Sequence, residues 1–122
     1  MVNLMRPKIV GKITQETIDL LGLEIKPDTL IYLGESNIQH MKTSHPEDFA
    51  KYFNCLEDII ANPDFLAKHP IDKSIQYIKV IDGHVMVGVR ISNSGLYYAR
   101  TIFKMSQEKI ERYIKKNALK MV

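Results

Sequence analysis

The stretch that decides the fold runs from Ser74 to Met105 and reads SIQYIKVI-DG-H-VMVGVRIS-NSG-LYYARTIFKM. It contains three apolar runs, rich in β-branched and aromatic residues, and two breaks at Asp82-Gly83 and Asn93-Ser94-Gly95. Asp-Gly between apolar runs is among the strongest short signals for a β-hairpin, and loops of three residues with glycine are also common. The stretch therefore predicts a three-stranded antiparallel meander with strands at 74–81, 85–92 and 96–105.

In the middle strand, β-branched apolar residues occupy every second position, and this alternation predicts which side chains share a face of the meander. The positions expected to face the core are Val85, Val87, Val89 and Ile91. The positions expected on the opposite face are His84, Met86, Gly88, Arg90 and Ser92. A two-residue Asp82-Gly83 turn would pair Ile81 with His84, and this register would add Tyr77 and Lys79 to the opposite face.

Two registers are open for the last hairpin. If Asn93-Ser94-Gly95 is a three-residue loop with Gly95 in the left-handed region, Ser92 pairs with Leu96. The face opposite the core then gains Tyr98, Arg100 and Lys104, while Tyr97, Thr101 and Phe103 turn to the core. A two-residue Ser94-Gly95 turn would instead bring Tyr97 and Thr101 across, because one step of register reverses every side chain. We favour the three-residue loop.

The rest of the chain predicts an α+β domain. Strands are expected at 8–13 and 30–33, with a helix from the Thr14 cap to Leu21 between them. A short helix should begin at the Ser36 cap, a longer helix should cover 46–60, and a last helix should cover 107–119. The order is thus N-terminal strand and helix segments, then an antiparallel β-meander and a C-terminal helix, with the helices on one face of the sheet.

Length and composition are those of an ordinary globular domain. A chain of 122 residues is most simply one domain, 1–122, and its 45% hydrophobic and 25% charged residues are typical values. No apolar run approaches the roughly 20 residues that cross a bilayer, so no membrane partner is expected. Residues 1–10 lack the apolar core of a signal peptide, and a cytoplasmic location is expected. The single cysteine, Cys55, leaves no internal disulfide framework.

Positive charge gathers at the C-terminal end. The net charge is +3, but residues 96–122 hold seven Lys or Arg residues against only Glu108 and Glu111. Such a local positive field can concentrate a polyanion. A solvated basic helix is an equally common reading, so the charge alone decides nothing.

The candidate chemistry centres on two histidines, His40 and His45, which lie in the stretch from Ser36 to Pro46. On one continuous helix they would stand about 140° apart, but Pro46 disfavours helical dihedrals at His45 and predicts a break that helps them converge. Imidazoles near their pKa of about 6.5 can accept and donate the protons of RNA cleavage, and guanidinium groups such as Arg90 and Arg100 can stabilise the phosphorane charge. Capping or surface roles are the alternative reading of two histidines in this position.

Other chemistries have less support. The spacing of His40 and His45 lacks the His-Glu-x-x-His pattern, and no thiol or acidic ligand stands at a telling spacing, so no metal site and no cofactor are expected. There is no Gly-rich phosphate loop and no Gly-x-Ser-x-Gly elbow. His69 and His84 are expected to be structural or exposed.

These motifs together resemble a known family. Ser36-Asn37-Ile38-Gln39-His40 with His45 downstream, the segment Ile60–Asp64, and Arg100-Thr101 on the last strand are similar to phage-borne nuclease domains. These belong to the barnase–EndoU–colicin–RelE superfamily, and the resemblance covers about residues 30–105. It implies helices followed by a four-stranded antiparallel meander, with a metal-independent ribonuclease activity that is often toxin-like or phage-encoded.

The resemblance implies that His40, His45, Arg100 and Thr101 are catalytic, and the face argument adds Arg90. Lys79, Tyr98 and Lys104 are expected to bind substrate from the same face of the sheet. RNA is the expected partner, and a toxin of this kind would also have a protein inhibitor. The alternative is a catalytically inert RNA-binding or protein-interaction domain of the same fold. The sequence names neither the RNA nor the oligomeric state.

Overall fold

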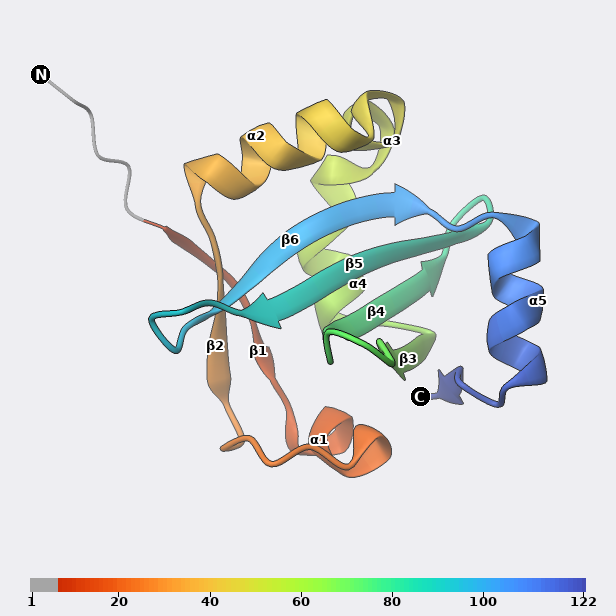
Figure 1. Ribbon diagram of the computed structural model, residues 1–122. Helices are drawn as coiled ribbons and strands as arrows, with labels where there is room; N and C mark the ends of the chain where they lie inside the picture. The colour runs from red at the N-terminus through yellow and green to blue at the C-terminus, as the bar shows by residue number, and fades with distance from the viewer. Residues whose placement is uncertain (1–6) are drawn as a thin grey trace, which may run out of the picture.

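A single sheet joins the N-terminal and C-terminal parts of the chain, as Figure 1 shows for the computed structural model, which describes residues 7–122. Its strands are β1 (Lys8–Ile13), β2 (Thr29–Leu33), β3 (Phe65–Lys68), β4 (Ile75–Val80), β5 (His84–Ile91), β6 (Tyr97–Lys104) and β7 (Lys120–Met121). They lie in the order β1-β2-β6-β5-β4-β3-β7. The β2–β6 pair is parallel and the other pairs are antiparallel.

Side-chain hydrogen bonds cap the N-termini of the first and the last helix. The helices are α1 (Gln15–Leu21), α2 (Glu35–Ser44), α3 (Pro46–Tyr52), the 3-10 turn η1 (Phe53–Cys55), α4 (Leu56–Ala61) and α5 (Gln107–Lys115). Thr14 caps α1 through its hydroxyl oxygen, as predicted, and Ser106 caps α5 in the same way. The predicted Ser36 cap is wrong: α2 begins after Gly34, whose N–H donates to Asn37 Oδ1 at 2.8 Å.

The α+β prediction is confirmed, and the four-stranded meander that the resemblance implies is β3-β4-β5-β6. The sequence pattern did not predict its first strand, β3. The last helix ends at Lys115 rather than near Leu119, and β7 then pairs with β3. The predicted helix over 46–60 is divided by η1. The signal-peptide prediction rests partly on residues 1–6, which lie outside the described residues.

The sheet has two faces that pack differently, and the prediction of helices on one face only is wrong. On the first face the larger core surrounds Ile59 of α4, and α4 lies behind β4 and β5 in Figure 1. On the second face a smaller cluster joins Ile110 of α5 to Ile78 and Met86. Helix α5 covers only one end of this face, and it leaves the part nearer to α2 open. No helix within residues 7–122 is long and apolar enough to span a membrane.

The β4–β5 hairpin has a register different from the predicted one. Val80 pairs with His84, so the loop holds three residues, Ile81 to Gly83, instead of two. Asp82 is held away from a tight turn because its carboxylate binds Tyr52 and Lys51 of α3. The shift by one residue turns Lys79 to the first face, where its Nζ donates to the Asn62 carbonyl at 2.8 Å. The prediction that Lys79 lies on the second face is therefore wrong. The same prediction is wrong for Tyr77, which is buried in the larger core of the first face.

The β5–β6 hairpin follows the favoured register at its loop and then departs from it. The Ser92 N–H donates to the Leu96 carbonyl, and Gly95 has a left-handed φ of 89°. Arg90 consequently pairs with Tyr98. Between Gly88 and Val89 a β-bulge shifts the register, so that Thr101 lies opposite Gly88 and Phe103 opposite Met86. Thr101 and Phe103 thus belong to the second face, and the prediction that they face the core is wrong.

Candidate functional site

A pocket of about 290 Å³ occupies the open part of the second face. Side chains from α2, the β3–β4 loop, β4, β5, β6 and α5 line it, although these segments are far apart in the sequence. The lining residues are His40, His69, Asp72, Ser74, Gln76, Met86, Gly88, Arg90, Arg100, Thr101, Phe103 and Lys109. The pocket therefore gathers imidazole, guanidinium, hydroxyl and ammonium groups around one cavity.

The β-bulge places Arg100 and Thr101 together at the pocket. In a regular strand, successive side chains point to opposite faces, so both could not line the same cavity. The bulge leaves Arg100 unpaired between Ala99 and Thr101 and aims both side chains at the second face. Gly88 makes room, since a methyl group at that position would lie 2.8 Å from Thr101 Cγ2. The placement of Arg100 and Thr101 at one site, which the family resemblance implied, thus depends on a local irregularity and a facing glycine.

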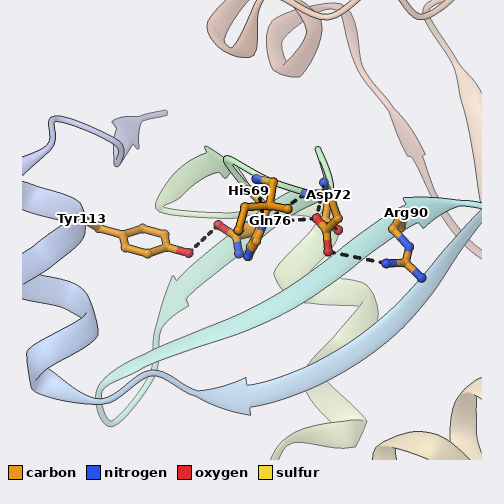
Figure 2. Close-up of polar contacts among 7 residues, drawn as sticks. His69, Asp72, Gln76, Arg90 and Tyr113 are labelled. Atoms are coloured by element: carbon orange, nitrogen blue, oxygen red, sulfur yellow. Dashed lines mark hydrogen bonds and ion pairs between the residues drawn. The ribbon is translucent and has the colours of Figure 1, made fainter.

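A polar network on the β3–β4 loop holds Arg90 in place (Figure 2). The Asp72 carboxylate accepts hydrogen bonds from the Ser74 hydroxyl at 2.6 Å and the Ser74 N–H at 2.9 Å, and it lies 3.5 Å from Arg90 Nη1. Partial burial by itself would raise the pKa of Asp72, but the Ser74 hydrogen bonds and the charges of His69 and Arg90 lower it. Asp72 is therefore a carboxylate that anchors Arg90 at the pocket wall.

His69 belongs to the same network and was not predicted as a site residue. Its Nδ1 accepts the N–H groups of Ile71 at 3.2 Å and Asp72 at 3.3 Å. In the neutral ring these bonds place the proton on Nε2. In the protonated ring Nδ1 would face Asp72 Oδ1, which is 3.3 Å away. A sequence-based prediction of β3 could have revealed His69. A strand that ends at Lys68 puts His69 at the edge of the sheet.

Gln76 brings a buried amide to the pocket floor. Its side chain is only 2% exposed, and its Oε1 accepts the Tyr113 hydroxyl of α5 at 3.0 Å. Figure 2 shows Tyr113 reaching Gln76 from the side opposite Arg90. Because the carbonyl oxygen is engaged, the amide N–H groups are the donors that Gln76 has left for a bound group.

The structure separates the two predicted histidines. His40 lies on the exposed side of α2, lines the pocket, and has its Nε2 3.3 Å from Ser44 Oγ. The predicted helix break occurs at His45, but the His45 ring packs on Phe103 with 4.6 Å between ring centroids. It lines a separate shallow groove with Pro46 and Asp48. The predicted convergence of His40 and His45 in one cavity is therefore wrong, and His69 is the second histidine of the pocket.

The chain matches, over residues 7–112, the family described as phage-Barnase-EndoU-ColicinE5/D-RelE like nuclease 3. The chain belongs to this family. The match extends beyond the 30–105 region of the resemblance and includes every pocket residue. No curated protein and no solved structure matches the chain.

The remaining predicted residues of this nuclease-like domain do not line the pocket. Tyr98 lines a neighbouring groove, which Arg100 also lines. Lys104 is at the end of β6, where its N–H donates to Asp48 Oδ2 at 3.1 Å and its side chain lies against Gly83. Lys79 is on the first face. Lys109 of α5, by contrast, lines the pocket, with its Nζ 5.0 Å from the centre of the Phe103 ring.

Proposed function

We propose that this domain is a metal-independent endoribonuclease that cleaves RNA by general acid–base transesterification in the pocket of the second face. The observation that carries the proposal is the gathering of His40, His69, Arg90 and Arg100 around one cavity. Two imidazoles can supply the base and the acid, and cationic donors can stabilise the charge that develops on phosphorus. Membership of a nuclease-like family supports a nucleic acid as the substrate.

The scissile phosphate would lie between the arginines. Guanidinium groups bind phosphate oxygens in a bidentate manner, and Arg90 is already oriented by Asp72. The Thr101 hydroxyl and the Gln76 amide can donate further hydrogen bonds, and Lys109 adds a third positive charge. Removing one such donor from a preorganised oxyanion site typically costs a factor of about 10²–10³ in rate.

We assign the base to His40 and the acid to His69. Neutral His40 would take the proton of the ribose 2′-hydroxyl, whose oxygen then attacks phosphorus. The bond from phosphorus to the 5′-oxygen breaks, and that oxygen receives a proton from His69 Nε2. The Asp72 carboxylate, 3.3 Å from Nδ1, would face the imidazolium before this transfer. The products are a 2′,3′-cyclic phosphate and a free 5′-hydroxyl.

The sequence-based predictions of a toxin-like role, a cytoplasmic location and a protein inhibitor are part of this proposal. An active ribonuclease would harm the cell that makes it, so expression of the wild-type chain alone should reduce growth. Expression of the His40→Ala variant should not.

The direct test is incubation of the purified protein with single-stranded RNA and with DNA of the same sequence, both in excess EDTA. We expect cleavage of the RNA only, with cyclic phosphate ends, because DNA lacks the attacking hydroxyl. His40→Ala and His69→Ala should each lower the rate by about 10²–10⁴-fold, while His45→Ala, the matched control, should stay near wild type. RNA that stays intact but binds in a salt-dependent manner would instead favour the inert binding domain.

A further inference from the structure

A second groove of about 380 Å³ lies beside the pocket and shares one wall with it. Gly34 of the β2–α2 turn lines this groove, together with Glu35 and Asn37 from the first turn of α2 and Tyr98 from β6. Arg100 lines both cavities, so its guanidinium group marks the boundary between them. The volume is within the range of about 300–1,000 Å³ that is usual for small-molecule sites. The two cavities are therefore neighbouring compartments along one strand.

Tyr98 gives this groove an aromatic wall. Because β2 and β6 pair in parallel with Tyr32 opposite Tyr98, the two rings lie 6.0 Å apart with a tilt of 44°. Residue 34 has no side chain, and a methyl group there would lie 3.9 Å from Tyr98 Cε1 and 3.3 Å from Asn37 Oδ1. Glycine at this position thus leaves the space beside the Tyr98 ring unfilled, while Tyr32 supports the ring from the neighbouring strand.

The polar groups of the groove suit a neutral ligand rather than a second phosphate. Glu35 adds a negative charge, and one of its carboxylate oxygens accepts the Gln39 side-chain amide at 3.1 Å. Asn37 Oδ1 accepts the Gly34 N–H, which leaves the Asn37 amide N–H groups as donors. The pocket beyond Arg100 carries instead Arg90 and Lys109. Phosphate should therefore prefer the pocket, and an uncharged ring with hydrogen-bonding edges should prefer the groove.

We propose that the groove is a nucleobase subsite, in which Tyr98 stacks on the base of the nucleotide whose phosphate binds at Arg100. The inference rests on the proposed binding of RNA in the pocket and adds where the adjoining base goes. Recognition of single-stranded RNA commonly combines stacking on aromatic side chains with hydrogen bonds to the base edges. Arg100 binds the phosphate from the shared wall, and Glu35 and Asn37 face the base edge.

The test compares the dissociation constants of adenosine 3′-monophosphate, uridine 3′-monophosphate and inorganic phosphate, measured by calorimetry. Stacking of a base on an aromatic side chain contributes about 1–3 kcal/mol, which corresponds to about 5- to 150-fold in affinity. Wild-type protein should bind a nucleotide more tightly than phosphate by such a factor. Tyr98→Ala should remove that advantage without changing phosphate binding, and Tyr98→Phe should keep it. If Tyr98→Ala does not fold, Tyr98→Leu replaces it, since leucine fills the volume without an aromatic face.

The subsite proposal would be overturned if folded Tyr98→Ala or Tyr98→Leu still bound a nucleotide more tightly than phosphate by the wild-type factor. Equal binding of nucleotide and phosphate by the wild-type protein would overturn it too. These outcomes are separate from the proposed activity. If RNA is not cleaved but the advantage depends on Tyr98, the subsite stands and the cleavage proposal fails.

Discussion

Two neighbouring rows of residues run across β4, β5 and β6 and face opposite sides of the sheet. The apolar row consists of Tyr77, Val87 and Ile102, each at most 1% exposed in the larger core. The polar row consists of Gln76, Gly88 and Thr101, and it lines the pocket. These residues lie one position before the apolar row on β4 and β6, and one position after it on β5. The same three strands therefore carry the packing on one face and the candidate chemistry on the other.

The regular packing of the apolar row explains how the fold can tolerate an irregular polar row. The apolar row is regular, and its burial contributes about 25 cal/mol per Å² of apolar surface removed from water. The polar row contains a glycine and lies beside a bulge, features that weaken a strand on their own. Stability supplied by the first face allows that local cost on the second. Changes to the two rows should consequently separate stability from activity.

Among the variants that separate the two faces, the largest effect should come from removing positive charge at the pocket. We expect Arg100→Ala to lower RNA cleavage by about 10²–10³-fold, because it takes away a preorganised donor to the phosphate. Lys79→Ala is the matched control, since it removes a cation from the same sheet but from the first face. Initial rates under single-turnover conditions measure both. An equal loss in Lys79→Ala would show that net charge, and not the pocket, governs the activity.

The next effect tests the contact between Gly88 and Thr101. Gly88→Ala should lower the free energy of unfolding by about 1–3 kcal/mol and also slow cleavage, because the new methyl group would displace the Thr101 side chain. Thr101→Ser removes the contacting methyl group and keeps the hydroxyl. The double variant should therefore recover much of both losses, as measured by urea unfolding and by cleavage rate. Losses that simply add would contradict a direct contact.

A smaller effect should follow from trimming the apolar row. Ile102→Val deletes one buried methyl group and should cost about 0.5–1.5 kcal/mol of stability. The cleavage rate per folded molecule should stay unchanged, because the missing group faces the other side of the sheet. Urea unfolding measures the loss of stability, and the cleavage assay at low temperature measures the rate per folded molecule. A tenfold loss of activity in folded Ile102→Val would break the separation of the faces.

The smallest effect concerns the contact between α3 and the β4–β5 loop, remote from the pocket. Hydrogen bonds from Lys51 and Tyr52 lower the pKa of Asp82 to about 2. A carboxyl with a lowered folded-state pKa stabilises the fold above its unfolded pKa of about 3.9, and it loses this contribution as the pH falls towards 2. Asp82→Asn should thus have a lower Tm than wild type at pH 7, and the difference should shrink by pH 2. A difference that does not depend on pH would contradict this role.

Much of the sheet could be predicted because its signals are local. The alternation of Val85, Val87 and Val89 placed these residues in the core, and Gly95 fixed the last loop. Ile91 was expected in the core by the same pattern, but it is 49% exposed at the end of β5. Strand alternation does not reveal where a core ends.

What could not be predicted depends on contacts between distant segments. Asp82 forms a longer loop because α3 binds its carboxylate, and this one step of register moved Lys79 to the other face. The bulge that puts Arg100 and Thr101 on the same face lies opposite Gly88 and Val89, and strand alternation does not reveal it. His69 was missed because β3 was missed, and His45 was misplaced because its ring packs on Phe103.

His40 and His69 line one pocket, and NMR of the four histidine rings tests whether RNA binds there. The ligand is an RNA oligonucleotide with 2′-O-methylribose at every position, which is not cleaved because it has no free 2′-hydroxyl to attack phosphorus. We predict that the ring signals of His40 and His69 shift together on titration. The signal of His84, which stacks on Phe65 at the other end of β5, should stay in place. Shifts confined to His45 or His84, with the signals of His40 and His69 unchanged, would show that RNA does not bind in this pocket.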